Sequence, residues 1–275
     1  MVYHQKDSLS QNFIKHSALV TELLEVSDIN KDDTVLEIGA GKGIITYQLC
    51  KVAKDVIAIE KDFDLAHDLI EEGKKIPNLK VIVKDFLEFN LPSVPYKIFS
   101  NIPFSITAKI LHKILKSGNL PKSIYLIMQQ ETAKKFMGIP GETQSSVSAK
   151  PFYDIEILGD IDRTNFTLKP QVKIVFVQFK LKEKSFIKKE DKEDFFDFVI
   201  YGFNQWQPTV VESFKNIFSY NQLKSLKKIY KLGELKPSEL SFDNWLLLFK
   251  SYQKIVTNDQ KNLVKIFRKH YNERM

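Results

Sequence analysis

The stretch TVLEIGAGKG (residues 34–43) decides the fold of this chain. The run Thr34–Ile38 is typical of a buried strand, and three alternating glycines follow it at once. Glycine lets the backbone turn sharply into a helix and leaves room for a ligand where a Cβ atom would collide. No Ser or Thr follows Lys42, so the turn is not a P-loop. Ile44 stands where the dinucleotide fingerprint needs glycine, so it is not that fingerprint either.

Strand-like and helical stretches alternate on both sides of this turn as far as residue 180. The alternation predicts an α/β fold with a mostly parallel sheet and helices on both faces. Because no convincing helix separates the last two runs, we expect an antiparallel strand at the sheet edge. The strand-like runs are Thr34–Ile38, Val56–Glu60, Leu79–Asp85, Tyr96–Asn101, Ser123–Gln129, Ile155–Ile161 and Val172–Phe179, and the expected helices cover 17–26, 43–53, 62–73 and 105–117.

The sequence changes character after Lys180. A charged stretch reads as a linker, strand-like runs stop, and apolar residues recur at helical spacing. We therefore predict two domains, 1–180 and 181–275, the second all-helical, with a polar tail compatible with a further helix. The expected helical stretches are Phe195–Trp206, Val210–Phe218, Gln222–Tyr230 and Trp245–Ile255, and Pro208 and Pro237 punctuate them.

Composition narrows the class of protein. The chain has 275 residues, 43% of them hydrophobic, which excludes a mainly disordered chain. It has no apolar run long enough to span a membrane and no signal-peptide core at its start, so we expect a cytoplasmic protein. The single cysteine, Cys50, excludes a disulfide framework and a cysteine-based zinc site, and no metal is expected.

The net charge of +7 is unevenly distributed. Residues 181–275 contain 18 Lys and Arg against 12 Asp and Glu, and thus hold nearly all of the excess. A localised basic region suggests a polyanionic partner, either nucleic acid or an anionic membrane surface, although a solvated lysine-rich face is the simpler alternative. Only three of the 41 cations are arginine, so the charge suits phosphates rather than base reading.

Two acidic residues stand at the last positions of strands in the predicted sheet. Glu60 ends the second strand, and Asp85 ends the third. Ligands of such sheets lie beyond the carboxyl ends of the strands. A carboxylate there can accept hydrogen bonds from both ribose hydroxyls, and another can accept one from an adenine amino group. Together with the glycine turn, these residues predict an adenosine pocket.

The fourth strand ends in Asn101-Ile102-Pro103-Phe104. An exocyclic base amine is a poor nucleophile because its lone pair is delocalised into the ring. Two acceptors, the Asn101 side-chain oxygen and the Ile102 carbonyl, can hold the amine pyramidal. Pro103 fixes the turn, and Phe104 offers a face on which a flipped base can stack.

These motifs, together with Ser10-Gln11-Asn12-Phe13-Ile14, resemble the rRNA adenine N6-methyltransferases that use S-adenosylmethionine. That group includes the Erm enzymes of macrolide–lincosamide–streptogramin resistance and the KsgA/Dim enzymes. The phenylalanine after Pro103 and the modest C-terminal region resemble Erm more closely. The resemblance implies a Rossmann-like methyltransferase sheet in 1–180 and an RNA-binding helical domain in 181–275.

The resemblance also implies a role for each matching residue. Asn12 and Ile14 close over the cofactor, Gly39 and Gly41 line its methionine and ribose portion, and Glu60 takes the ribose hydroxyls. Asp85 and the Phe86 amide read adenine, and Asn101 also contributes to cofactor binding. Asn101 and Ile102 position the target amine, and Phe104 and Phe166 offer aromatic faces. The family loop F-x-P-x-P-x-V here has Leu168 in place of its first proline, so this sequence departs from the family pattern two residues after Phe166.

The implied activity is N6-methylation, once or twice, of one adenine in 23S rRNA, with resistance as the consequence. The implied partners are S-adenosylmethionine and rRNA. The protein is expected to be a monomer that does not bind a membrane. Three alternatives stay open: a KsgA-like 16S rRNA dimethyltransferase, a DNA adenine methyltransferase, and a non-catalytic assembly or transcription factor of the same fold. The intact set of site residues argues against the last.

Overall fold

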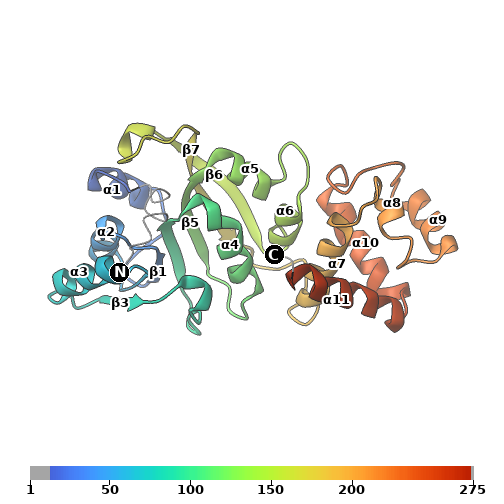
Figure 1. Ribbon diagram of the computed structural model, residues 1–275, viewed down its shortest axis with the longest axis horizontal. Helices are drawn as coiled ribbons and strands as arrows, with labels where there is room; N and C mark the ends of the chain where they lie inside the picture. Colours follow the sequence, from blue (N-terminus) through green and yellow to red (C-terminus); the bar gives the residue numbers. More distant parts are fainter. Residues whose placement is uncertain (1–12, 274–275) are drawn as a thin grey trace, which may run out of the picture. The chain divides into compact units, whose positions relative to one another are not determined.

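The structure is a computed structural model, and it describes residues 13–273 (Figure 1). The chain divides into two compact units. Unit 1 contains the described residues up to Ala133 together with Asp154–Leu181, and unit 2 contains Lys134–Tyr153 together with the described chain from Lys182. The predicted boundary after residue 180 lies next to the observed one. The assignment of 134–153 to the first domain differs from the structure, because this segment packs within unit 2.

Unit 1 is built on a seven-stranded sheet in the order β3-β2-β1-β4-β5-β7-β6. The pairs from β3 to β5 are parallel, and β7 runs antiparallel to β5. The antiparallel strand is therefore the last but one, and β6 forms the edge. The strands are β1 (Thr34–Ile38), β2 (Asp55–Glu60), β3 (Leu79–Val83), β4 (Lys97–Asn101), β5 (Ser123–Gln129), β6 (Tyr153–Ile161) and β7 (Ile174–Leu181).

Helices and short 3-10 turns connect these strands. Apolar faces of the first two helices bury Val20, Leu24 and Leu49 against the sheet residues Val35 and Phe99, which gives unit 1 its main core. Helix α5, which starts at the end of β5, was not predicted. The elements are α1 (Ser17–Glu25), α2 (Ile44–Val52), α3 (Phe63–Gly73), η1 (Phe86–Glu88), η2 (Phe104–Ile106), α4 (Thr107–Lys116), α5 (Gln130–Met137) and η3 (Arg163–Asn165).

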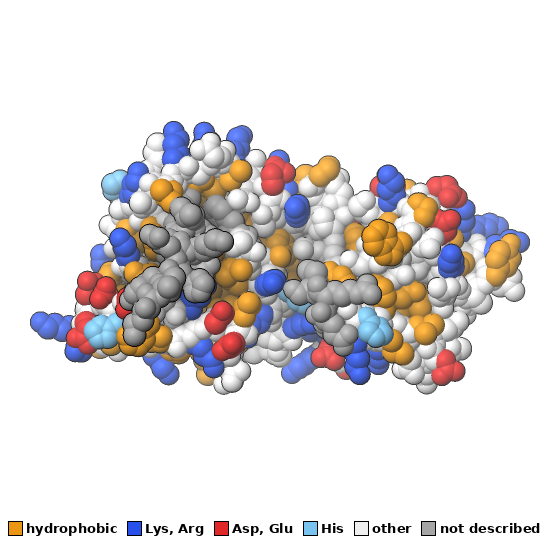
Figure 2. Space-filling view, viewed as in Figure 1, with side chains coloured by type: hydrophobic (Ala, Val, Ile, Leu, Met, Phe, Trp, Pro, Cys, Tyr) orange, Lys and Arg blue, Asp and Glu red, His pale blue; other side chains and the backbone are white. Residues whose placement is uncertain are grey.

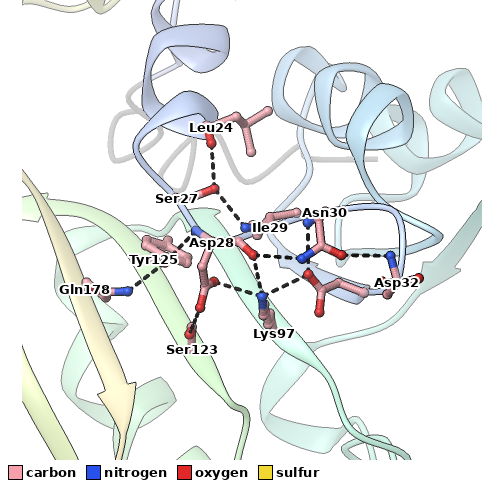
Figure 3. A network of polar contacts seen from close by, with 11 residues as sticks. Leu24, Ser27, Asp28, Ile29, Asn30, Asp32, Lys97, Ser123, Tyr125 and Gln178 are labelled. Atoms are coloured by element: carbon pink, nitrogen blue, oxygen red, sulfur yellow. Dashed lines mark hydrogen bonds and ion pairs between the residues drawn. The ribbon is translucent and has the colours of Figure 1, made fainter.

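A polar network ties the end of α1 to the amino ends of β4 and β5 (Figure 3). The buried Lys97 ammonium lies 2.9 Å from an Asp28 carboxylate oxygen and 2.8 Å from Asp33 Oδ2. Ser123 donates to Asp28, and Tyr125 Oη accepts from the Asp28 amide. A buried cation that is fully paired in this way fixes geometry. The network lies at the opposite ends of these strands from Asn101.

Unit 2 contains helices packed around an aromatic core. Phe198 stacks on Phe214 at 4.7 Å between ring centroids, and it contacts Trp245 and Tyr252. Helix α7 ends at Phe203 and α8 at Ser213, so the predicted helices Phe195–Trp206 and Val210–Phe218 run too far. The polar tail is helical. The helices are α6 (Gln144–Ala149), α7 (Lys192–Phe203), α8 (Val210–Ser213), α9 (Tyr220–Ile229), α10 (Phe242–Ile255) and α11 (Asn258–Glu273).

The surface carries charges of both signs. Figure 2 shows cationic and acidic side chains interspersed with apolar ones on the visible face. Within residues 13–273, no helix is long and apolar enough to cross a membrane.

Candidate active site

A cavity of about 530 Å³ opens in unit 1 at the carboxyl ends of β1, β2 and β4 and beside the loop that follows β3. This edge of the sheet is where the sequence predicts an adenosine pocket. Nine of the predicted site residues line the cavity: Ile14, Gly39, Gly41, Glu60, Asp85, Phe86, Asn101, Ile102 and Pro103.

The glycine turn forms one wall of the cavity. Gly39 has φ +72°, and a Cβ atom built there would meet nothing within 4 Å. Gly41 has φ +55°, and a Cβ atom there would lie 2.8 Å from the Phe13 ring. Positive φ values are strained for residues with a Cβ atom, and the ring leaves no space. Both glycines are therefore required to bring bare backbone to the cavity.

Glu60 is 3% exposed and is held by main-chain donors. Its Oε2 accepts from the Gly41 amide at 2.8 Å, and its Oε1 accepts from the amides of Lys61 and Asp62 at 2.8 and 2.9 Å. Each carboxylate oxygen has two lone pairs, so these bonds leave acceptor capacity for a ligand. The bond to Gly41 ties the end of β2 to the glycine turn across two neighbouring strands.

Asp85 and Phe86 form a neighbouring part of the lining, just after β3. The Asp85 side chain is exposed and accepts from the Leu87 amide at 2.7 Å, which caps the turn η1. The Phe86 ring is buried, with the Lys113 ammonium 5.7 Å from its centroid. The turn thus presents a carboxylate beside an apolar ring, an arrangement that suits a purine.

The turn after β4 is fixed by hydrogen bonds to Pro103. The Pro103 carbonyl accepts from the Ile106 amide and from the Thr107 hydroxyl, both at 3.2 Å. Ile102 is buried, while Asn101 is partly exposed and lines the cavity. Phe104 begins η2, and its side chain lies outside the described part of the structure.

The N-terminal segment closes another side of the cavity. Ile14 forms an antiparallel bridge with Phe166, and the Thr167 amide donates to the Phe13 carbonyl at 2.8 Å. The Phe166 side chain is fully buried in the core of unit 1 and does not line the cavity. The structure therefore packs this ring into the core beside the N-terminal segment, whereas the sequence predicts an exposed aromatic face at this position. Asn12 lies outside the described residues.

Glu37 is a lining residue to which the sequence analysis assigned no role. It is 1% exposed, and its Oε2 accepts from the Thr46 hydroxyl. Burial, with a smaller contribution from nearby Glu60, raises the pKa of Glu37 from 4.5 to about 8. The sequence does contain a signal for a functional role of Glu37, because it places a carboxyl group inside an otherwise apolar strand. Unpaired acids are rarely fully buried. Among residues 13–273, no cluster of three or more His, Cys, Asp or Glu could hold a metal.

The sequence matches the model of the family described as ribosomal RNA adenine dimethylase over residues 2–254. The chain belongs to this family. An rRNA adenine N-6-methyltransferase of Limosilactobacillus reuteri is 32% identical, over 89% of this chain and 95% of its own length. A ribosomal RNA small subunit methyltransferase A of Chlorobium phaeobacteroides is 31% identical, over 89% and 92%. The crystal structure of the 23S rRNA methyltransferase ErmE has a TM-score of 0.73 at 22% identity, covering 88% of this chain and all of its own.

The protein is therefore an rRNA adenine N6-methyltransferase that uses S-adenosylmethionine. The cavity fits this cofactor, because it combines bare glycine backbone, a carboxylate after each of two strands and an apolar ring. Glu60 and Asp85 also place two carboxylates in the cavity lining, which suits a cationic ligand. We predict that Glu60 binds the ribose hydroxyls and that Asp85 and Phe86 bind the adenine.

The Glu60→Ala substitution tests the ribose assignment. We expect it to weaken S-adenosylmethionine binding by roughly 10- to 100-fold, because hydrogen bonds to a charged acceptor contribute about 1.5–3 kcal/mol. Titration calorimetry measures the change. Glu71→Gln is the control, since the Glu71 carboxylate pairs with the Lys74 ammonium at the surface and does not line the cavity. Equal affinities of the Glu60→Ala and wild-type proteins would refute the assignment.

Proposed function

We propose that the protein methylates N6 of a specific adenine in 23S rRNA and thereby confers resistance to macrolide, lincosamide and streptogramin B antibiotics. The observation that carries this proposal is the turn Asn101-Ile102-Pro103-Phe104 at the edge of the cavity, whose phenylalanine after the proline resembles Erm enzymes. A relative named rRNA adenine N-6-methyltransferase at 32% identity supports the adenine N6 chemistry of this proposal. We further propose that the protein acts as a monomer.

The residues of this turn act by positioning the target amine. The Asn101 side-chain oxygen and the Ile102 carbonyl accept hydrogen bonds from the two amine hydrogens and direct the lone pair away from the ring. Bound S-adenosylmethionine supplies an electrophilic methyl group on a positively charged sulfur. The same two acceptors stabilise the positive charge that develops on N6, so no strong general base is needed at this stage.

A second candidate is dimethylation of 16S rRNA. It is favoured by a relative named ribosomal RNA small subunit methyltransferase A, whose identity of 31% is nearly the same. The chemistry at N6 is common to both candidates, so the lining of the cavity does not separate them. The choice depends on which RNA is bound.

Labelling of rRNA tests the proposal. The protein is incubated with radiolabelled S-adenosylmethionine and with protein-free 23S or 16S rRNA, and the modified base is mapped by primer extension. We expect label in the peptidyl-transferase loop of 23S rRNA, and expression in a susceptible host should raise the inhibitory concentration of erythromycin. Asn101→Ala protein, purified in the same way, controls for contaminating methyltransferases.

Label near the 3′ end of 16S rRNA would overturn the proposal in favour of the second candidate. Label on neither rRNA, with intact cofactor binding, would overturn both.

A further inference from the structure

Trp206 is the most exposed large apolar side chain among the described residues. Its relative exposure is 100%, whereas the other tryptophan of the chain, Trp245, is fully buried. Phe203, three residues earlier, stacks on Trp245 with 4.9 Å between ring centroids. Phe203 and Trp245 thus pack against each other in unit 2, whereas Trp206 lies outside this packing. A fully exposed indole forgoes the burial that usually stabilises this side chain.

The turn that carries Trp206 is well fixed. Asn204 Nδ2 donates to the Ile200 carbonyl at 2.8 Å, and Gln205 Nε2 donates to the Tyr201 carbonyl at 3.1 Å. These bonds satisfy carbonyls at the end of α7 and stop the helix before the tryptophan. A threonine N-cap begins α8 directly after the turn. The indole is therefore presented on an ordered backbone, which lowers the entropy lost on binding.

The charge of unit 2 indicates what this side chain meets. Unit 2 contains 21 Lys and Arg against 13 Asp and Glu, a net charge of +8, whereas unit 1 contains 20 against 21, a net charge of −1. The entire positive excess of the protein therefore lies in the unit that carries Trp206. Proteins that bind unpaired RNA combine cations for the phosphates with aromatic faces for the bases.

We propose that Trp206 is a stacking platform for an unpaired base of the rRNA substrate, while the cations of unit 2 hold the RNA backbone. The proposal rests on rRNA being the substrate, and it is independent of whether 23S or 16S rRNA is methylated. Stacking on a tryptophan is tolerant of base identity, so this contact adds affinity rather than sequence choice.

Tryptophan fluorescence of the wild-type protein tests the contact without a mutation. Since Trp245 is buried, quenching by acrylamide reports almost entirely on Trp206. We expect added rRNA to quench the exposed emission and to protect it from acrylamide. Emission that stays accessible in the RNA complex would overturn the proposal. Protection that instead depends on protein concentration without RNA would also overturn it, because it would indicate a second copy of this chain as the occupant.

Binding of an rRNA transcript that contains the methylated site gives the second test. We expect Trp206→Ala to raise the Kd by about 5- to 150-fold and Trp206→Phe to restore most of the affinity. The slope of log K against log salt should stay the same, since no charge is removed. Tyr220→Ala, which removes another exposed aromatic side chain of unit 2, is the matched control and should bind as wild type does.

The possible results distinguish a failure of the stacking contact from a failure of the proposed rRNA substrate. If the wild-type protein binds neither rRNA, the rRNA substrate and the stacking contact both fail. If the wild-type protein binds rRNA and Trp206→Ala binds equally well, only the stacking contact fails. Equal losses in the Trp206→Ala and Tyr220→Ala variants would also overturn it, because they would indicate a general loss of apolar surface.

Discussion

Replacing Asn101 with alanine is expected to reduce adenine methylation by at least about 10²–10³-fold, the usual cost of removing one hydrogen-bonding group that stabilises developing charge. Asn101 lies at the last position of β4, next to Ile127 of β5 in register, and lines the cavity. Truncation leaves the backbone acceptor of Ile102 in place but removes the side-chain acceptor. The amine then keeps only one of its two acceptors and is no longer held pyramidal. The rate is measured with saturating cofactor in single-turnover conditions.

The matched control is Asn101→Asp, which keeps an acceptor oxygen at the same position and should retain more activity than the alanine variant. Binding of S-adenosylmethionine should be largely preserved in both variants, because the ribose and adenine contacts are assigned to other residues. Turnover of Asn101→Ala close to that of the wild-type protein would exclude the assigned role.

The second large effect is expected when Glu37 is replaced with glutamine: the stability of the variant should depend much less on pH than that of the wild-type protein. The pKa of Glu37 is raised from 4.5 to about 8 by burial, so the folded state favours the protonated form. The stabilisation from this group is complete below about pH 4.5 and is lost as the pH rises to about 8, above which folding must bury a carboxylate. Between about pH 5 and pH 9 the wild-type protein should lose on the order of a few kcal/mol through this group.

Glutamine has nearly the same shape and cannot ionise, so the variant should lose much less stability over the same range. Urea denaturation at both pH values measures the free energy of unfolding. Glu22→Gln, in an exposed position of α1, is the control and should follow the wild-type protein. An identical pH dependence of Glu37→Gln and the wild-type protein would show that burial does not hold Glu37 in its protonated form.

The sheet was predictable because its signals are local. The central parallel strands β1, β4 and β5 are short apolar runs buried on both faces, and the glycine turn needs backbone angles that few other residues adopt. Helices α5 and α6 were missed for the opposite reason. The segment Gln144–Ala149 has little apolar periodicity, and its helix depends on a capping box between Thr143 and Ser146 and on burial within unit 2. Helical spacing also continues through Trp206, where side-chain hydrogen bonds to the end of α7 stop the helix.

Local sequence patterns likewise could not predict which segments belong to unit 2. The segment 134–153 joins it through contacts distant in sequence. The Glu142 amide donates to the Ser238 carbonyl at 2.8 Å, and Asn204 donates to Gln144 at 2.7 Å. No pattern of residues within the segment indicates such partners.

The sequence by itself determined the class of fold and the gathering of the glycine turn, Glu60, Asp85 and Asn101–Pro103 around one cavity, because the carboxyl ends of parallel strands meet at one edge of the sheet. Only the tertiary structure decided the positions of the residues whose roles depend on packing. Phe166 is fully buried beneath the N-terminal segment, Glu37 is a third acid in the wall of the cavity, and Trp206 lies in solvent. The physical reason is that burial is set by neighbours distant in the chain, and burial decides whether an aromatic ring stabilises a core or can contact a ligand.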